Sequence, residues 1–192
     1  MSDGVRKARG EGLEEEQFFA RRDAQLVEEL KERQRAEDAR DSLASALAID
    51  RSSVPDELIA LGLDPGEIAA LPLVPLVVVG WADGQLDDKE RRAILGAAGQ
   101  DGIDAESVAY RLLERWLEQR PSGTLVAAWR SYVSALCESL APEARQELQR
   151  DVVERARRIA EAAGGLLGRG KVSGQEERAL QDIEGAFELA SA

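Results

Sequence analysis

A long stretch without helix breakers is the feature that most constrains the fold of this chain. Residues 11–49 contain no glycine or proline after Gly12, and they are rich in Glu, Arg, Ala and Leu, which favour helices. The pattern predicts one helix of about 35 residues, about 50 Å long. Its middle, residues 31–41, is almost wholly polar, which is typical of a helix exposed to solvent. We therefore expect residues 1–50 to form an N-terminal helical arm.

The arm also carries apolar side chains, and their role has two interpretations. They either pack the arm across the domain that follows or bind a partner protein, in a coiled coil or in a groove. These residues are Phe18, Phe19, Leu26 and Leu30. The segment EEEQFFARRDAQLVEEL (14–30) resembles helical inhibitor proteins of the rotary ATP synthase, over the arm alone. That resemblance implies a helical protein-interaction or inhibitor protein that acts through its N-terminal arm.

Residues 51–192 predict a second, all-α domain. The chain is 44% hydrophobic, enough for a core, but only 4% aromatic, and it lacks the alternation expected of strands. Glycines and prolines divide the domain into helical segments. These segments lie near residues 56–62, 64–82, 87–99, 104–120, 124–140, 142–163 and 175–190. We expect a bundle of six or seven helices in which Cys137 is a small buried apolar residue.

Charge and residue usage exclude several classes of function. The formal net charge is −12, which disfavours binding to nucleic acid. The chain has no histidine and one cysteine, so it lacks the usual acid/base catalyst and the ligands of zinc. The segment GLLGRGKV (165–172) fits the spacing of a phosphate-binding loop but lacks the final Ser or Thr and follows a predicted helix. We expect no enzymatic activity and no required cofactor.

The most apolar run predicts a buried helix rather than a membrane span. IAALPLVPLVVVGWA (68–82) is too short to cross a bilayer and contains Pro72 and Pro75. The first ten residues are polar and of mixed charge, unlike a signal peptide. We therefore expect a cytoplasmic protein without a membrane span.

The stretch WADGQLDDKERRAI (81–94) gathers carboxylates at a joint between two predicted helices. One interpretation is structural. Gly84 suits the end of the first helix, Asp87 suits the N-cap of the second, and Glu90 stands three residues later, where a capping box requires it. On this interpretation Asp83 alone is left without a structural role.

The other interpretation of this corner is a metal site. Asp83, Asp87 and Glu90 match the second half of an EF-hand calcium loop. Val79 and Trp81 occupy positions where the first half needs ligands, so an intact EF-hand is excluded. The sequence still allows a weak Ca²⁺ or Mg²⁺ site in which the three carboxylates and a carbonyl are ligands and water completes the shell.

A second stretch, GRGKVSGQEERAL (168–180), has a similar pattern. Ser173 takes the place of Asp87, and Glu176 takes the place of Glu90. Each copy follows one predicted long helix and begins another. The similarity predicts two related helix–corner–helix units that pack about a pseudo-twofold axis with their corners close together.

An apolar helix running into W-A-D-G-x-L-D-x-x-E resembles the TerB-like domains, named from bacterial tellurite-resistance operons. The resemblance covers about residues 54–190. It implies a compact helical bundle, divalent metal at acidic corners, and a non-catalytic role in stress response or scaffolding. The metal-site residues it implies are Asp83, Asp87, Glu90 and, at the second corner, Glu176. The chain departs from the family at Arg169, Lys171 and Ser173, and we expect the charges of Arg169 and Lys171 to neutralise the first corner in place of a metal.

Overall fold

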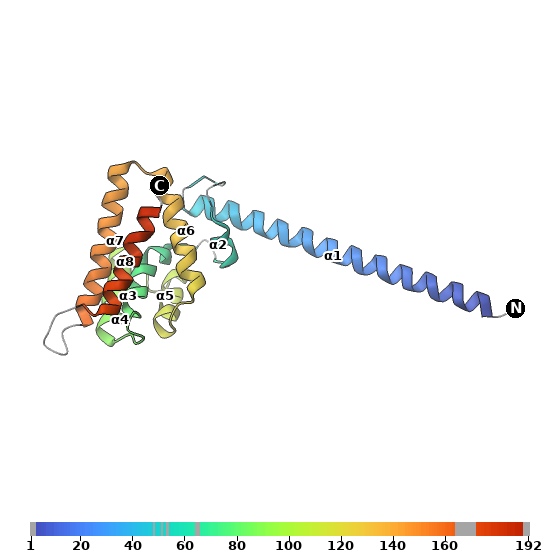
Figure 1. Cartoon of the computed structure of the whole chain (residues 1–192), viewed down its shortest axis with the longest axis horizontal. Coiled ribbons are helices and arrows are strands. Elements are labelled where there is room, and N and C mark those ends of the chain that lie inside the picture. The colour runs from blue at the N-terminus through green and yellow to red at the C-terminus, as the bar shows by residue number, and fades with distance from the viewer. Residues whose placement is uncertain are drawn as a thin grey trace. The chain divides into compact units, whose positions relative to one another are not determined.

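The computed structural model describes residues 3–47, 49–50, 52, 54–63, 66–163 and 172–189. These residues form eight α-helices and one 3₁₀-helix, η2, and include no β-strand (Figure 1). The prediction of an all-α fold is confirmed. The chain divides into two units, residues 1–40 and residues 41–192.

The first helix, α1 (Asp3–Leu47), contains 45 residues. All side chains in the range 25–38 are exposed, as predicted for its polar middle. The helix carries its own ion pairs there, because Glu28 lies 3.8 Å from both Lys31 and Arg35. Leu43 is only 1% exposed and belongs to a core cluster. The boundary between the units therefore falls inside α1, at residue 40, and not at residue 50 as the sequence predicted.

Most of the remaining elements lie within the predicted segments. They are α2 (Asp56–Ala60), η2 (Ile68–Leu73), α3 (Val74–Gly80), α4 (Asp88–Gln100), α5 (Val108–Glu118), α6 (Gly123–Ser139), α7 (Pro142–Ala163) and α8 (Gly174–Leu189). Serine side chains cap two of them: Ser107 accepts a hydrogen bond from an amide of α5, and Ser122 does the same for α6. The start of α6 lies within one residue of its prediction, whereas α5 begins at Val108 and not at residue 104, because the Ser107 cap was not recognised in the sequence.

One predicted helix is replaced by two shorter elements. A single helix was expected over residues 64–82, but η2 precedes α3 there. Pro72 lies inside η2 and Pro75 in the first turn of α3. Proline lacks an N–H and is tolerated at the start of an α-helix but not in its interior, so the two prolines separate the elements.

Helix α3 occupies the centre of the second unit. Within α3 every residue is buried except Val78, which is partly exposed. The helix packs against α4, α6, α7 and α8, and α7 and α8 also pack against each other (Figure 1). A helix that is apolar on all sides is expected to be surrounded in this way.

Two clusters of buried apolar side chains form the core, and α3 contributes to both. In the first, the rings of Trp129 and Phe187 meet edge to face with centroids 6.3 Å apart. The second joins α3 and η2 to α4 and α5. Cys137 is buried in the first cluster, and burial raises the pKa of its thiol, as expected for an unreactive core residue. Among the helices described, none is long and apolar enough to span a membrane.

Candidate functional site

The first corner connects α3 to α4 through residues 81–87. Gly84 has a φ of +96°, a conformation that glycine adopts without strain, and its N–H donates to the carbonyl of Trp81 at 3.0 Å. Asp83 accepts a hydrogen bond of 2.9 Å from the N–H of Gln85. The sequence left Asp83 without a structural role, and the structure shows that its side chain stabilises the turn itself.

A complete capping box begins α4. Asp87 Oδ1 accepts hydrogen bonds from the N–H groups of Lys89, at 2.7 Å, and Glu90, at 2.8 Å. Glu90 Oε2 accepts one in return from the N–H of Asp87, at 2.9 Å. The predicted capping box is confirmed, and it satisfies amides that have no partner inside the helix.

Close packing holds this corner in place. A Cβ on Gly80 would lie 2.6 Å from Leu86 Cδ1, so the absence of a side chain at Gly80 allows Leu86 to fold back onto α3. Trp81 Nε1–H donates to the carbonyl of Trp116 at 2.9 Å. The guanidinium of Arg91 donates to the next carbonyl, that of Leu117. The end of α5 therefore anchors the corner on both sides.

The second corner repeats the capping box at the start of α8. Ser173 Oγ accepts a hydrogen bond of 3.2 Å from the N–H of Glu176, and the Glu176 carboxylate accepts one from the N–H of Ser173. Glu176 is 6% exposed, so it is buried like its counterpart Glu90. Arg169, Lys171 and most of the segment 165–172 lie outside the described residues, and the predictions made for them stay predictions.

Glu90 is a predicted site residue whose carboxyl group is buried close to other carboxylates. Its side chain is 4% exposed, and burial is the main reason that its pKa rises to about 7. The hydrogen bond from the N–H of Asp87 opposes the rise, while the charges of Asp87, Asp83 and Glu176 add to it. Because Glu176 acts on Glu90, the two corners lie close enough for their charges to interact. Glu90 is thus a carboxyl group that changes protonation near neutral pH.

The arrangement of the carboxylates favours capping over metal binding. In the part of the chain that the structure describes, no three His, Cys, Asp or Glu side chains are grouped so that they could hold a metal ion. Asp87 Oδ1 already accepts two backbone hydrogen bonds, and Glu90 Oε2 accepts one. A Ca²⁺ or Mg²⁺ site at Asp83, Asp87, Glu90 and Glu176 stays a prediction from the sequence.

The predicted partner-binding residues of α1 are partly described. Leu26 is 49% exposed and Leu30 is 61% exposed, while the side chains of Phe18 and Phe19 lie outside the described part. Val27, also 49% exposed, was missed by the sequence reasoning. Its place three residues before Leu30 could have revealed it, because residues three and four apart are neighbours on a helix surface.

Comparison with known proteins gives no match to this chain. No family, no curated protein and no solved structure resembles it closely enough to be recognised. The TerB-like resemblance therefore rests on the corner motif of residues 81–90 alone and stays an expectation.

Proposed function

We propose that this protein is a non-catalytic helical interaction protein that binds a partner protein through α1. The observation that carries the proposal is the exposed apolar face formed by Leu26, Val27 and Leu30. They are three of the four large apolar side chains found exposed among the described residues, and the fourth, Val108, lies on α5. Apolar side chains gathered on an exposed helix are typical of a binding surface.

The spacing of these residues favours insertion into a groove of the partner. Leu26 and Leu30 would occupy adjacent core positions of a coiled coil, but the core positions before and after them are Asp23 and Arg33. A long coiled coil would bury those charges, which is unfavourable. Two leucines and a valine within one and a half turns match instead the short apolar face of a helix bound in a groove.

The surroundings of the apolar face support a preformed binding helix. Glu28 pairs with Lys31 and Arg35, and Gln34 Nε2 donates to Asp38 at 2.8 Å. Pairs three or four residues apart, such as Glu28–Lys31 and Gln34–Asp38, stabilise a helix by about 0.2–0.5 kcal/mol each. A helix that is already formed loses less conformational entropy on binding than a disordered segment does.

The test compares partner capture by three forms of the full chain. Extract of the source organism is passed over immobilised wild type, over Leu26→Ser/Leu30→Ser, and over Gln25→Ser/Ala36→Ser, two exposed positions on the same helix, as a matched control. Bound proteins are quantified by mass spectrometry. We expect a partner that wild type and the control retain and that the leucine variant loses. Identical partners on all three, or none on wild type, would contradict the proposal.

A second candidate function is the metal-responsive scaffold that the TerB-like resemblance implies. The observation that favours it is the negative environment of Glu90, to which Asp83, Asp87 and Glu176 all contribute. A divalent cation would relieve that repulsion, and so would a proton. On this proposal the corner senses a cation in a stress response and the protein is a scaffold without catalysis. Thermal unfolding with and without metal tests it, as described below.

A further inference from the structure

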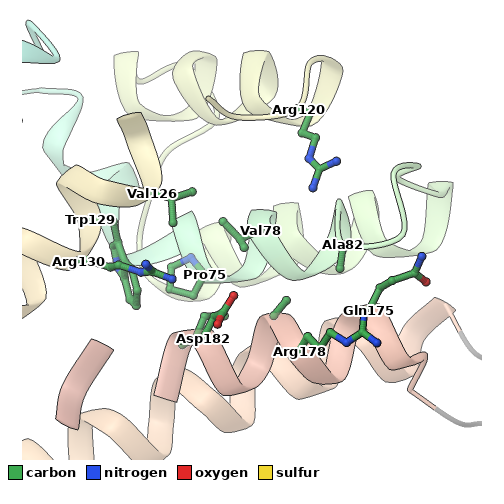
Figure 2. Close-up of a pocket in the computed structure, with 12 residues that line it drawn as sticks. Pro75, Val78, Ala82, Arg120, Val126, Trp129, Arg130, Gln175, Arg178 and Asp182 are labelled. Carbon is green, nitrogen blue, oxygen red and sulfur yellow. The ribbon is translucent and has the colours of Figure 1, made fainter. Parts of the chain in front are cut away.

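A groove of about 280 Å³ lies over α3, between α6 and α8. Figure 2 shows Pro75 and Val78 on α3 and Ala82 just after its end, with Trp129 from α6 beside them. The first three recur at intervals of three and four residues, so one face of α3, continued by Ala82 in the first corner, forms the apolar floor. The only partly exposed residue within α3 is Val78, and it opens into this groove. The central helix is therefore accessible to a ligand from this side.

The rim of the groove is positively charged in a strongly acidic chain. Arg120 and Arg178 reach toward the groove from the turn after α5 and from α8, and Arg130 comes from α6 (Figure 2). None of the three forms a hydrogen bond or ion pair with a residue that the structure describes. Asp182 is the one carboxylate among the residues that line the groove. The formal net charge of the rim is therefore positive, although that of the protein is −12.

We infer that this groove binds a small amphipathic carboxylate, a molecule with one carboxylate on an acyl or aromatic body. The apolar body lies against the partly exposed Val78 and Val126, and the carboxylate lies between Arg120 and Arg178. Guanidinium groups match the two oxygens of a carboxylate through paired hydrogen bonds. The apolar floor supplies most of the binding free energy, since it removes apolar surface from water.

Size and charge select this ligand class over others. The volume is slightly below the range of about 300–1,000 Å³ that is usual for small-molecule sites, so it admits one ring or a short acyl chain. Asp182 would repel a dianion such as a phosphate monoester more strongly than a monoanion. An acidic peptide is the macromolecular alternative, and the experiment below separates it from a small carboxylate.

The experiment measures binding of octanoate to the full chain by isothermal titration calorimetry at low salt. Octanamide has the same apolar body without the charge, and acetate has the charge without the body. We expect octanoate to bind at least about tenfold more tightly than octanamide, and acetate not to bind. Arg120→Gln/Arg178→Gln should weaken octanoate binding about tenfold or more, as expected for the loss of charge-assisted hydrogen bonds. Arg150→Gln, an exposed arginine of α7 outside the groove, should leave the affinity unchanged.

Circular dichroism confirms that each variant is folded, which is expected because the altered arginines are exposed. Leu26→Ser/Leu30→Ser should bind octanoate like wild type, so a failure of this inference is distinct from a failure of the partner-binding proposal. The inference is overturned if octanoate does not bind, if octanamide binds equally well, or if the double arginine variant binds like wild type. It is also overturned if an acidic hexapeptide saturates the groove while octanoate does not.

Discussion

The two helix corners share one local motif but differ in their electrostatics. At both corners the side-chain oxygen of the cap residue accepts a hydrogen bond from the N–H three residues later, which belongs to a buried glutamate. The carboxylate of that glutamate accepts a hydrogen bond from the N–H of the cap residue. At the first corner the cap is Asp87, with Asp83 nearby, and burial with these charges raises the pKa of Glu90 to about 7. At the second corner the cap is the neutral Ser173. The comparison shows that the same capping box forms with a charged cap or a neutral one, and that at the first corner burial and the nearby carboxylates raise the pKa of its glutamate.

The largest change in stability is expected from a substitution in the packing behind the first corner. Gly80→Ala places a Cβ 2.6 Å from Leu86 Cδ1 and should destabilise the protein by about 1–3 kcal/mol, as overpacking does. Gly96→Ala is the matched control within α4, because a Cβ there meets no atom within 4 Å. It should stabilise by about 0.5–1 kcal/mol through helix propensity. Urea unfolding of both variants measures the difference, and equal effects would show that Leu86 moves aside freely.

The protonation of Glu90 should give the next largest effect. A glutamate with a pKa of about 7 when folded and 4.5 when unfolded binds more protons in the folded state between these values. Its contribution to stability is therefore fully present below about pH 4.5 and is lost as the pH rises through 7. Glu90→Gln mimics the protonated form, so it should match wild type at pH 5 and be about 1–2 kcal/mol more stable at pH 8, after allowance for solvent screening.

Unfolding in urea across pH 5–8 tests this prediction. Glu176→Gln is the control at the second corner, because it keeps the acceptor for Ser173 and removes one of the charges that act on Glu90. This variant should lower the pKa of Glu90. Its free energy of unfolding should therefore still fall as the pH rises, but at a lower pH than that of wild type. A Glu90→Gln variant that follows wild type at every pH would mean that Glu90 is ionised throughout this range.

Removing the two N-caps, Asp87 and Ser173, should give losses of stability that differ from each other by a smaller amount than the effects above. Asp87 accepts two backbone hydrogen bonds, at 2.7 and 2.8 Å, while Ser173 accepts one at 3.2 Å. We expect Asp87→Ala to destabilise by about 1–2 kcal/mol and Ser173→Ala by about 0.5–1 kcal/mol, within the range for lost caps. Both are measured at pH 5, where Glu90 is protonated in the folded protein. A larger loss at Ser173 would show that the number of hydrogen bonds does not determine the strength of these caps.

Metal binding at the first corner should give the smallest effect. If Ca²⁺ binds at millimolar strength, 1 mM of the ion stabilises by about 0.4 kcal/mol, whereas a micromolar site would give about 4 kcal/mol and raise the melting temperature by several degrees. Thermal unfolding with EDTA, Ca²⁺, Mg²⁺ and Mn²⁺ separates these cases. A large shift that disappears in Asp83→Asn would make the first corner a genuine metal site and favour the scaffold proposal.

Much of the fold could be predicted because helix boundaries depend on neighbouring residues. The caps at Asp87 and Ser173 and the proline at the start of α7 were all visible in the sequence. The separation of η2 from α3 was missed, although Pro72 and Pro75 signalled an irregularity there. The boundary inside α1 was missed because the burial of Leu43 depends on the core cluster and not on the helix itself.

The candidate sites were predicted less completely than the fold. Sequence reasoning placed Asp83, Asp87 and Glu90 at one corner, but it had no basis for the raised pKa of Glu90. It also missed the arginine-rimmed groove, since its residues come from distant positions on α3, α6 and α8 and from the turn after α5. No spacing within the chain signals such a site.

The sequence by itself determined the helical class, the places where most helices begin and end, and both capping boxes. These features follow from backbone geometry and from hydrogen bonds between residues at most four positions apart. Only the tertiary structure decided which glutamates are buried, that Trp81 donates to Trp116, and that three arginines surround one apolar groove. Burial and electrostatic interaction act through space, so they depend on which helices pack together and not on the order of residues along the chain.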